Sequence, residues 1–558
     1  MAKVHFFPAD VSVEAERGTT ILQAALKAGV VLESPCNGEG TCGKCKVRLQ
    51  SQYLSCIVEE GDHHRLSAAE KAAGFVLSCQ ARIQDDLEVE VVPQQKNHTL
   101  QILSKGKSLD VELSGLIDKV YDGESQTTQI WAGDELLGSE KGDTTQQNFG
   151  VVVDIGTTTL VASLIDINKG EELETASSLN PQSLHAQDVL SRIKLASAEE
   201  GLELMYSGVI TEINSLIAQV ARKAGVELHN VYEVIFSGNT CMLHLATGVN
   251  PESLGKHPYI PQVRGGNHVG AAEHGLKIAD FGLIYLPPIV SAYVGADITS
   301  GMLAADIKEQ EGVTLFVDIG TNGEMVIGVN GKLAATSTAA GPAFEGMNIT
   351  HGMRAGHGAV ELFEIGPEGQ IKIETIGNAP AVGICGSGLL DIVGELVAHG
   401  VINKTGRYVD PSRTDLPESL KERLVKKEGK PVFIIAPNVW LTQKDVRQVQ
   451  LAKGAVRAGI EFLLQASEIS AEQVDRVLIA GSFGYHLRAK SLLNIGMLPR
   501  EFDGKIDFVG NTSKTGGEAL LLNTDCRDKI SDIVADIEVL DLAGYENFDR
   551  VFVDCLGF

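Results

Sequence analysis

The chain has 558 residues, 44% of them hydrophobic, and 73 Asp and Glu outnumber 47 Lys and Arg to give a net charge of −26. This length predicts about two to four domains, and the hydrophobic content is that of folded domains. An acidic protein lacks the basic face that nucleic acids require, so we expect no nucleic-acid partner. We also expect a cytoplasmic protein without membrane association, because no apolar run reaches about 18 residues and the N-terminus lacks a signal-peptide pattern.

Short elements open the chain. Residues Val4–Phe7 and Val11–Val13 predict two strands around a turn. Residues Thr19–Gly29 predict a short amphipathic helix, because a Thr precedes apolar residues at helical spacing and a Gly follows them. Residues Leu87–Val92 predict a further strand.

Cysteines are concentrated in this N-terminal region. Cys36, Cys42 and Cys45 follow the spacing Cys-x5-Cys-x2-Cys on a Gly-rich loop, and Cys79 comes later. Four thiolates suit either zinc or an iron–sulfur cluster. Because there is a single Cys-x2-Cys pair with a distant fourth cysteine, the spacing favours a plant-type [2Fe–2S] cluster, with zinc as the alternative. Cys56 is either a spare buried thiol or an alternative ligand.

Together these elements resemble the ferredoxin family. The resemblance implies a β-grasp domain over residues 1–95 whose cluster ligands are Cys36, Cys42, Cys45 and Cys79. Residues 96–149 are polar and predict a linker with a small β-rich connecting module, which includes β-like runs such as Thr128–Trp131.

A motif of strand, Asp, Gly-Thr turn and strand occurs twice. Its copies begin with Asp154-Ile155-Gly156-Thr157 and Asp318-Ile319-Gly320-Thr321, 164 positions apart. Two copies with matching flanks indicate a duplicated lobe. The turns expose backbone N–H groups and hydroxyls that can bind phosphate; their residues are Gly156, Thr157, Thr158, Gly320, Thr321 and Asn322.

The two aspartates of the motif, Asp154 and Asp318, are the candidate catalytic residues. A carboxylate at a strand end can place Mg²⁺, usually through water, or orient an attacking water molecule. The alternative is that both only form turns. The chain contains no Gly-x4-Gly-Lys-Ser/Thr motif, so a P-loop is excluded.

This pattern resembles the superfamily of actin, sugar kinases and heat-shock chaperones, whose ribonuclease H-like halves clamp ATP. The resemblance implies an ATPase over residues 150–558, with lobes at about 150–310 and 311–558. Two Gly-rich stretches are candidates for contact with adenosine, although each alone is also typical of helix caps or packing glycines. Their residues are Gly386, Ser387, Gly388, Gly481, Ser482 and Gly484. Residues Lys444–Gln465 predict a core helix.

Several stretches are more distinctive: Asn180–Gln182, Asp188–Ile193, Ser237–Met242, Leu286–Asp297, Ala340–Gly346 and Gly352–Ala355. With the ferredoxin-like region, they resemble the reductive activators of corrinoid proteins over nearly the whole chain. Comparable members usually have Gly-Ala where this chain has Ala186-Gln187, and the longest relatives have a longer connecting segment.

The resemblance implies an α/β multidomain enzyme that uses ATP to return a corrinoid protein from Co(II) to Co(I), one electron passing through the [2Fe–2S] cluster. It also implies ATP and Mg²⁺ as cofactors, a low-potential electron donor and a homodimer. Ser237, Asn239 and Pro287–Asp297 are expected to build the cleft or the corrinoid-protein surface, and Glu324 to face solvent or the cleft rim. The alternatives are an ATP-dependent donor to another low-potential enzyme and a ferredoxin-fused small-molecule kinase.

Overall fold

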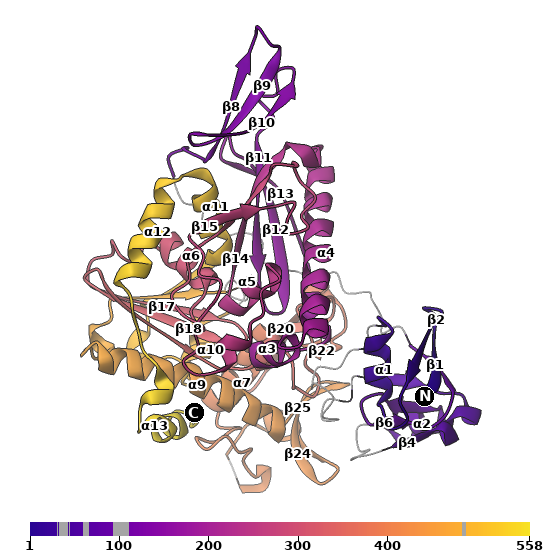
Figure 1. Cartoon of the computed structure of the whole chain (residues 1–558). Coiled ribbons are helices and arrows are strands. Elements are labelled where there is room, and N and C mark those ends of the chain that lie inside the picture. The colour runs from indigo at the N-terminus through magenta and orange to yellow at the C-terminus, as the bar shows by residue number, and fades with distance from the viewer. Residues whose placement is uncertain are drawn as a thin grey trace. The chain divides into compact units, whose positions relative to one another are not determined.

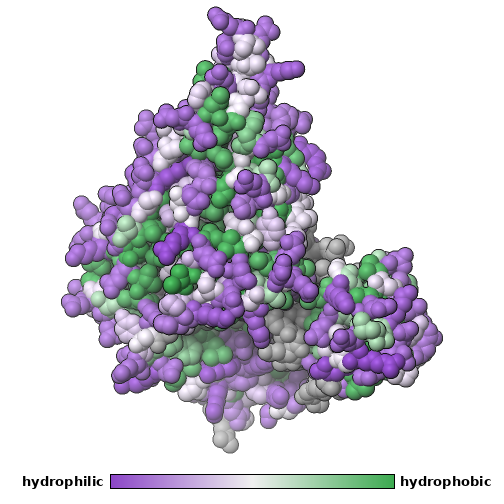
Figure 2. Space-filling model, viewed as in Figure 1, coloured by the Kyte–Doolittle hydropathy of each residue, from purple (hydrophilic) through white to green (hydrophobic). Residues whose placement is uncertain are grey.

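The structure, a computed structural model, describes residues 1–30, 32, 43, 45–59, 66–92, 111–413, 415–481 and 487–558 (Figure 1). Contacts within the chain divide it into two compact units. One comprises Met1–His98 and Pro181–Gly201, and the other comprises Thr99–Asn180 and Leu202–Phe558. Within the described ranges, no helix is long and apolar enough to cross a membrane. Hydrophilic side chains cover most of the face seen in Figure 2, as the net charge of −26 leads one to expect.

The N-terminal residues form a mixed five-stranded sheet against which one helix packs, the β-grasp arrangement. The sheet order is β2-β1-β7-β3-β5, with β1 antiparallel to β2 and parallel to β7. The strands are β1 (Ala2–Phe7), β2 (Val11–Ala15), β3 (Lys46–Arg48), β5 (Phe75–Leu77) and β7 (Leu87–Glu90). A second, two-stranded sheet pairs β4 (Ile57–Glu59) with β6 (Ala81–Ile83).

The predicted elements of this region are confirmed. Helix α1 (Ile21–Lys27) starts where the Thr20 side chain accepts a hydrogen bond from Gln23 N at 3.2 Å. Its Ile21 and Ala25 are buried with alternate residues of β1 and β7, which form the core of the sheet. A second short helix, α2 (Ala68–Ala72), is capped by Ser67.

The stretch after Asn180 contains α3 (Val189–Ala196), which is capped by Asp188. Arg192 is fully buried on this helix and donates hydrogen bonds to Ala186 O at 3.0 Å and Gln182 Oε1 at 2.9 Å. The guanidinium group therefore holds the residues before the helix against it.

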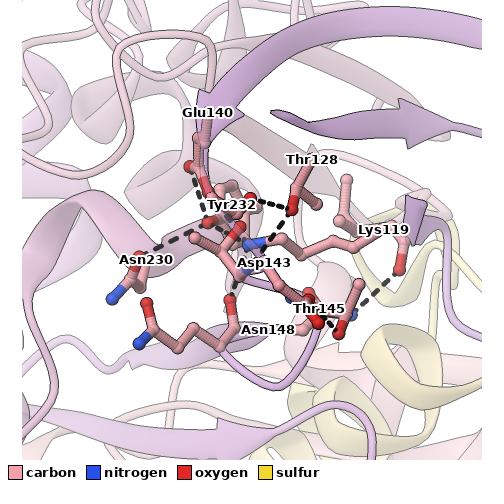
Figure 3. A network of polar contacts seen from close by, with 12 residues as sticks. Lys119, Thr128, Glu140, Asp143, Thr145, Asn148, Asn230 and Tyr232 are labelled. Carbon is pink, nitrogen blue, oxygen red and sulfur yellow. Dashed lines mark hydrogen bonds and ion pairs between the residues drawn. The ribbon is translucent and has the colours of Figure 1, made fainter. Parts of the chain in front are cut away.

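The connecting region forms a three-stranded antiparallel sheet in the order β10-β9-β8. Its strands are β8 (Ile117–Asp122), β9 (Thr127–Ala132) and β10 (Glu135–Lys141). A buried polar network joins this sheet to Tyr232 at the start of β14 (Figure 3). Ile117 and Ile130 pack against the same tyrosine. The β-rich module expected here is present, and it is anchored to the first lobe.

The first large sheet has the order β13-β12-β11-β14-β16-β15, in which β11, β14 and β16 are parallel and β12 and β13 are antiparallel additions. Its strands are β11 (Phe149–Ile155), β12 (Thr159–Asp166), β13 (Glu171–Leu179), β14 (Val231–Gly238), β15 (Asn267–Gly270) and β16 (Leu283–Leu286).

The second large sheet repeats this topology in the order β27-β26-β17-β18-β19-β28. β17 is again antiparallel to β18 and parallel to β26, so β17 occupies the place of β11. The strands are β17 (Val313–Ile319), β18 (Gly323–Val329), β19 (Lys332–Thr338), β26 (Arg476–Ala480), β27 (Ile506–Gly510) and β28 (Glu538–Val539). The duplication predicted from the repeated motif is confirmed.

Helices fill the space between the two sheets. α11 packs against β11 and β14 of the first sheet, and α12 contacts β19 of the second. The predicted lobe boundary at about residue 310 assigns α11 to the second lobe by sequence. In the structure, however, this helix packs on the sheet of the first lobe. The helices of this unit are α4 (Glu199–Ala224), α5 (Thr240–Ala246), α6 (Ala296–Ala304), α7 (Gly386–Ala398), α8 (Glu418–Lys421), α9 (Gln443–Ala466), α10 (Ala489–Asn494), α11 (Thr512–Leu522), α12 (Asp525–Asp536) and α13 (Phe548–Asp554).

Two smaller sheets complete the second lobe. One has the order β21-β20-β22 and the other β23-β24-β25. Their strands are β20 (Ala359–Ile365), β21 (Ile371–Thr375), β22 (Gly383–Ile384), β23 (Leu424–Lys427), β24 (Lys430–Ala436) and β25 (Val439–Thr442). Helix α9 packs against β18 and β19, which confirms the core helix predicted for Lys444–Gln465.

Candidate nucleotide and iron–sulfur sites

One pocket gathers both copies of the repeated motif. Asp154 is the penultimate residue of β11, and Asp318 holds the same position in β17. Both line the pocket, together with the turns that follow them. The turn residues in its wall are Gly156, Thr157, Thr158, Gly320, Thr321 and Asn322. The structure thus brings together, from two lobes, all the residues for which the sequence suggested contacts with phosphate or Mg²⁺.

Backbone hydrogen bonds make both turns tight. Gly156 N donates to Thr159 O, and Gly320 N donates to Asn322 O, each at 3.0 Å. A Cβ atom on Gly156 would lie 2.6 Å from Thr159 O, so only glycine allows the first turn to close in this way. Such turns present hydroxyls and backbone N–H groups to the pocket, as anion binding requires.

Asp154 is held by the N-terminus of α11. Its Oδ2 accepts a hydrogen bond from Asn511 Nδ2 at 2.7 Å, and its Oδ1 accepts one from Ser513 Oγ at 2.8 Å. Burial raises the pKa of Asp154, and these two donors oppose that rise. Because Asn511 also caps α11, the orientation of the carboxylate is tied to a helix between the sheets.

Three further carboxyl groups face the same pocket with raised pKa values. Burial and the negative charge of Asp154 raise the pKa of Asp318 to about 7. Burial and the charge of Asp318 raise the pKa of Asp297 to about 8. Burial, followed by the charge of Asp297, raises the pKa of Glu324 well above its usual value. Like charges crowded into a buried site favour bound protons or a cation.

The expectation that Glu324 faces solvent or the cleft rim is wrong. The residue is 5% exposed and lines the pocket beside Asp318, its cross-strand neighbour. Strand β18 is buried on both faces over most of its length, so alternation along the sequence gives no indication of which side chains point outward.

The Gly-rich stretches contribute unequally. Gly386 and Ser387, at the start of α7, line the pocket, and so does Gly481. Gly388 does not belong to the pocket wall; a Cβ atom there would lie 2.0 Å from Val360 O, so this glycine permits α7 to pack on β20. Ser482 and Gly484 lie outside the described residues.

Other cleft residues come from the distinctive stretches. Asn239 lines the pocket and donates from Nδ2 to Thr157 Oγ1 at 3.0 Å. Ser237 lies behind it, with its Oγ 2.9 Å from Ser513 Oγ. Asp297, at the end of the stretch Pro287–Asp297, also lines the pocket. The expectation that these residues build the cleft is therefore met at Asn239 and Asp297, whereas Ser237 lies outside the pocket wall and contacts Ser513, which lines it.

The sequence alone gave no role to four further residues that line the pocket, which are Glu345, Arg354, Asn511 and Ser513. The signal available for Asn511 and Ser513 was their position directly after strand β27, at the carboxyl edge of the second sheet. Glu345 and Arg354 belong to the distinctive stretches Ala340–Gly346 and Gly352–Ala355, whose chemistry the sequence alone did not indicate.

Two of the four predicted cluster ligands lie side by side in the ferredoxin-like sheet. Cys45 and Cys79 are 2% and 6% exposed, and their Sγ atoms are 3.2 Å apart, well beyond the length of a disulfide bond. The register of β3 and β5 brings the two cysteines together, because it pairs Lys46, which follows Cys45, with Leu77, which precedes Ser78 and Cys79. Ser78 N also donates a hydrogen bond to Cys45 O at 2.9 Å.

These two thiols fit a cluster site. They are close enough to bind one metal ion, and the neighbouring Ser78 Oγ is buried without a hydrogen-bond partner among the described residues. Cys36 and Cys42 lie outside the described residues. Cys56 instead packs against the apolar core of the sheet, as its interpretation as a spare thiol requires.

Three comparisons with known proteins agree on the kind of protein to which this chain is similar. The family described as "2Fe-2S iron-sulfur cluster binding domain" matches residues 4–84, "RACo middle region" matches 149–310, and "C-terminal domain of RACo the ASKHA domain" matches 312–558. The chain is 29% identical to "Corrinoid activation enzyme RamQ" of Eubacterium limosum over 548 residues, which cover 92% of each chain. It is 26% identical to "[Co(II) methylated amine-specific corrinoid protein] reductase" of Methanosarcina barkeri over 74% of this chain and 77% of that protein.

Among solved structures, the chain is similar to "Reductive activator for corrinoid,iron-sulfur protein". The identity is 31%, the TM-score is 0.73, and the match covers 100% of this chain and 98% of the other. The likeness therefore extends over both the ferredoxin-like and the two-lobed regions.

Proposed function

Because the chain belongs to the family of reductive activators of corrinoid proteins, we propose that it uses ATP to return a corrinoid protein from Co(II) to Co(I). The observation that carries the proposal is the union, on one chain, of a ferredoxin-like sheet with adjacent buried thiols and a two-lobed pocket with duplicated Gly-Thr turns. The first suits a one-electron carrier and the second suits a nucleotide. We place their boundaries at residues 1–95 and 150–558, joined by residues 96–149.

In the pocket, the two turns bind the phosphates of ATP. Their hydroxyls and backbone N–H groups are donors, and the turns face the same space from two sheets. Gly386, Ser387 and Gly481 are in the pocket wall without bulky side chains, which supports close approach of the adenosine. We assign Ser482 and Gly484 to the same contact from the sequence.

Asp154 and Asp318 place Mg²⁺ near the phosphates. Among the described residues, the pocket wall carries one basic side chain, Arg354, against six carboxyl groups, so an anionic nucleotide needs a cation to enter. The carboxyl groups are those of Asp154, Asp297, Asp318, Glu324, Glu345 and Glu361. In the described ranges, no three His, Cys, Asp or Glu side chains are arranged to hold a metal directly, which favours contact through water.

At the other site, Cys45 and Cys79, with Cys36 and Cys42, hold the iron–sulfur cluster. When bound, a [2Fe–2S] cluster supplies one electron at a time. The buried position of Cys45 and Cys79 keeps water from their sulfur atoms, and the hydrogen bond from Ser78 N to Cys45 O fixes their separation. We further propose a low-potential protein as the electron donor and a homodimer as the assembly, on the family resemblance.

ATP is needed because Co(II) in these carriers accepts an electron only at a very low potential. Moving one electron uphill by about 100 mV costs roughly 2.3 kcal/mol, which ATP turnover can supply. The chain offers a means of coupling, because Asp154 and Asp318 belong to different sheets and meet in one pocket. A nucleotide bound there sets the position of one lobe against the other.

The test is the appearance of the Co(I) absorption spectrum when the protein, a Co(II) corrinoid protein and a strong chemical reductant are mixed. With ATP we expect Co(I); without ATP, or with Asp318→Asn, we expect the rate to fall on the order of 100-fold or more. Cys79→Ser is expected to lose the cluster and the activity, whereas Cys56→Ser, the matched control, keeps both. An equal rate without ATP, or stoichiometric zinc in place of iron, would contradict the proposal.

A further inference from the structure

Glu345 connects the two phosphate turns. Its Oε2 accepts a hydrogen bond from Thr158 Oγ1, and its Oε1 accepts one from Thr321 Oγ1. Thr158 belongs to the turn after β11 and Thr321 to the turn after β17, so the donors come from different sheets. One carboxylate therefore ties the turns of the two lobes to each other.

The fold fixes the position of this carboxylate. Glu345 ends a short 3₁₀ helix, Pro342–Glu345, in which Phe344 is 1% exposed and part of the core of the second lobe. Gly341 N donates to Thr321 O at 2.9 Å, which joins this segment to the second turn. Gly346 has φ 75°, and a Cβ atom there would lie 2.5 Å from Met353 O. The backbone that carries Glu345 is therefore tightly packed, and it positions the Glu345 side chain beside the two turns.

The two hydroxyls cannot serve Glu345 and a phosphate group at once. A threonine hydroxyl has a single hydrogen to donate, and Glu345 accepts that hydrogen from both Thr158 and Thr321. A phosphate oxygen at either turn needs the same hydrogen. A carboxylate and a phosphate are both anionic acceptors, so they also repel each other in this pocket.

We propose that Glu345 is a displaceable latch, which holds the phosphate turns of the two lobes together until a phosphate group of the nucleotide takes its place at Thr158 and Thr321. The latch rests on the proposed function, because it assigns a nucleotide to this pocket. It makes Glu345 a positioning residue, whose release from the hydroxyls accompanies phosphate binding. Part of the free energy of phosphate binding is then spent on separating Glu345 from the turns.

The experiment compares the dissociation constants of ATP and adenosine for the wild-type chain and two variants. Glu345→Gln removes the charge. Glu345→Asp keeps the charge but is one methylene shorter, so it cannot reach both hydroxyls. We expect both variants to bind ATP about tenfold more tightly, which corresponds to about 1.4 kcal/mol. Adenosine has no phosphate and should bind with unchanged affinity.

Each other result has a distinct meaning. If only Glu345→Gln binds ATP more tightly, the effect is charge repulsion and the latch is wrong. If the affinities for ATP and for adenosine change by the same factor, Glu345 only supports the structure of the pocket and the latch is wrong. If neither variant binds ATP more tightly while ATP hydrolysis falls, Glu345 acts in the chemical step instead. If the wild-type chain itself binds no ATP, the proposed function fails and the latch fails with it.

Discussion

Glu518 on α11 lies beside Lys514, a lysine whose side chain is 1% exposed and which also donates to Glu172. The Glu518 side chain is 19% exposed, and its Oε1 lies 3.3 Å from Lys514 Nζ. Burial raises the pKa of Glu518 to about 7 although the lysine opposes the rise, and the nearby Glu172 adds to it. One lysine thus faces two carboxylates, and Glu518 is ionised at a cost to the folded state.

This arrangement predicts a pH-dependent effect of Glu518→Gln. The pKa of Glu518 is higher in the folded chain than in the unfolded one, so stability falls as pH rises between about 4.5 and 7. The amide avoids that loss. We expect the variant to match the wild type at pH 4.5 and to be more stable at pH 8, by on the order of 2 kcal/mol.

Thermal unfolding at the two pH values measures this difference. The exposed Glu501 offers a matched control, because Glu501→Gln should leave the thermal midpoint unchanged at both pH values. A gain of equal size at pH 4.5 and pH 8, or a loss at pH 8, would show that Glu518 is not the group responsible.

At the residue scale, the sequence predicts the site residues that belong to a repeated or specifically spaced motif. Asp154 and Asp318 were found because the motif occurs twice, and Cys45 and Cys79 because their spacing is specific. Asn511, which donates to Asp154, is 357 positions away from it, and no local pattern indicates such a contact. Glu345 belongs to the distinctive stretch Ala340–Gly346, but its contact with Thr158 depends on how the two lobes meet.

At the element scale, the β8–β10 sheet is fastened to the first lobe by charged groups in the interior. Lys119, with a side chain 1% exposed, is 3.1 Å from Glu140 Oε2 and donates to Tyr232 Oη at 2.6 Å (Figure 3). Tyr232 in turn donates to Glu140 Oε1 at 2.8 Å. A buried ion pair is stable only when its remaining hydrogen-bonding positions are filled, and the tyrosine hydroxyl fills one on each partner.

We therefore predict that Tyr232→Phe destabilises the attachment of this sheet by about 1–3 kcal/mol, because both charged groups lose a buried partner. The expected result is faster amide hydrogen exchange in β8–β10, with ATP affinity unchanged. Tyr121→Phe, at a tyrosine that is 39% exposed on the same sheet, is the matched control. Exchange that is unaltered in Tyr232→Phe would mean that apolar packing alone holds the sheet.

Elements with a local signal were predictable. Strands β1, β2 and β7, the strands on either side of the repeated motif, and helices α1 and α9 follow from apolar periodicity and caps. The parallel–antiparallel order of the second large sheet repeats that of the first. The packing of α11 on the first sheet was not predictable, because this contact joins segments from opposite ends of the ATPase region. The attachment of β10 through Glu140 to Tyr232, 92 positions later, was not predictable for the same reason.

At the scale of the whole molecule, two chemistries are joined on one chain. The ferredoxin-like region supplies buried thiols, and the two-lobed region supplies a pocket whose walls come from both sheets. These parts act in sequence on one corrinoid protein: the electron passes through the protein's own cluster, and ATP controls its transfer.

A single-turnover experiment tests this claim most directly. The protein is reduced beforehand, excess reductant is removed, and a Co(II) corrinoid protein is added with or without ATP. With ATP, we expect the electron paramagnetic resonance signal of the reduced cluster to disappear as Co(I) forms, in equal amounts and at the same rate. Without ATP, the cluster signal should persist and the corrinoid protein should remain as Co(II). Formation of Co(I) while the cluster signal persists, or equal loss of that signal without ATP, would contradict the account.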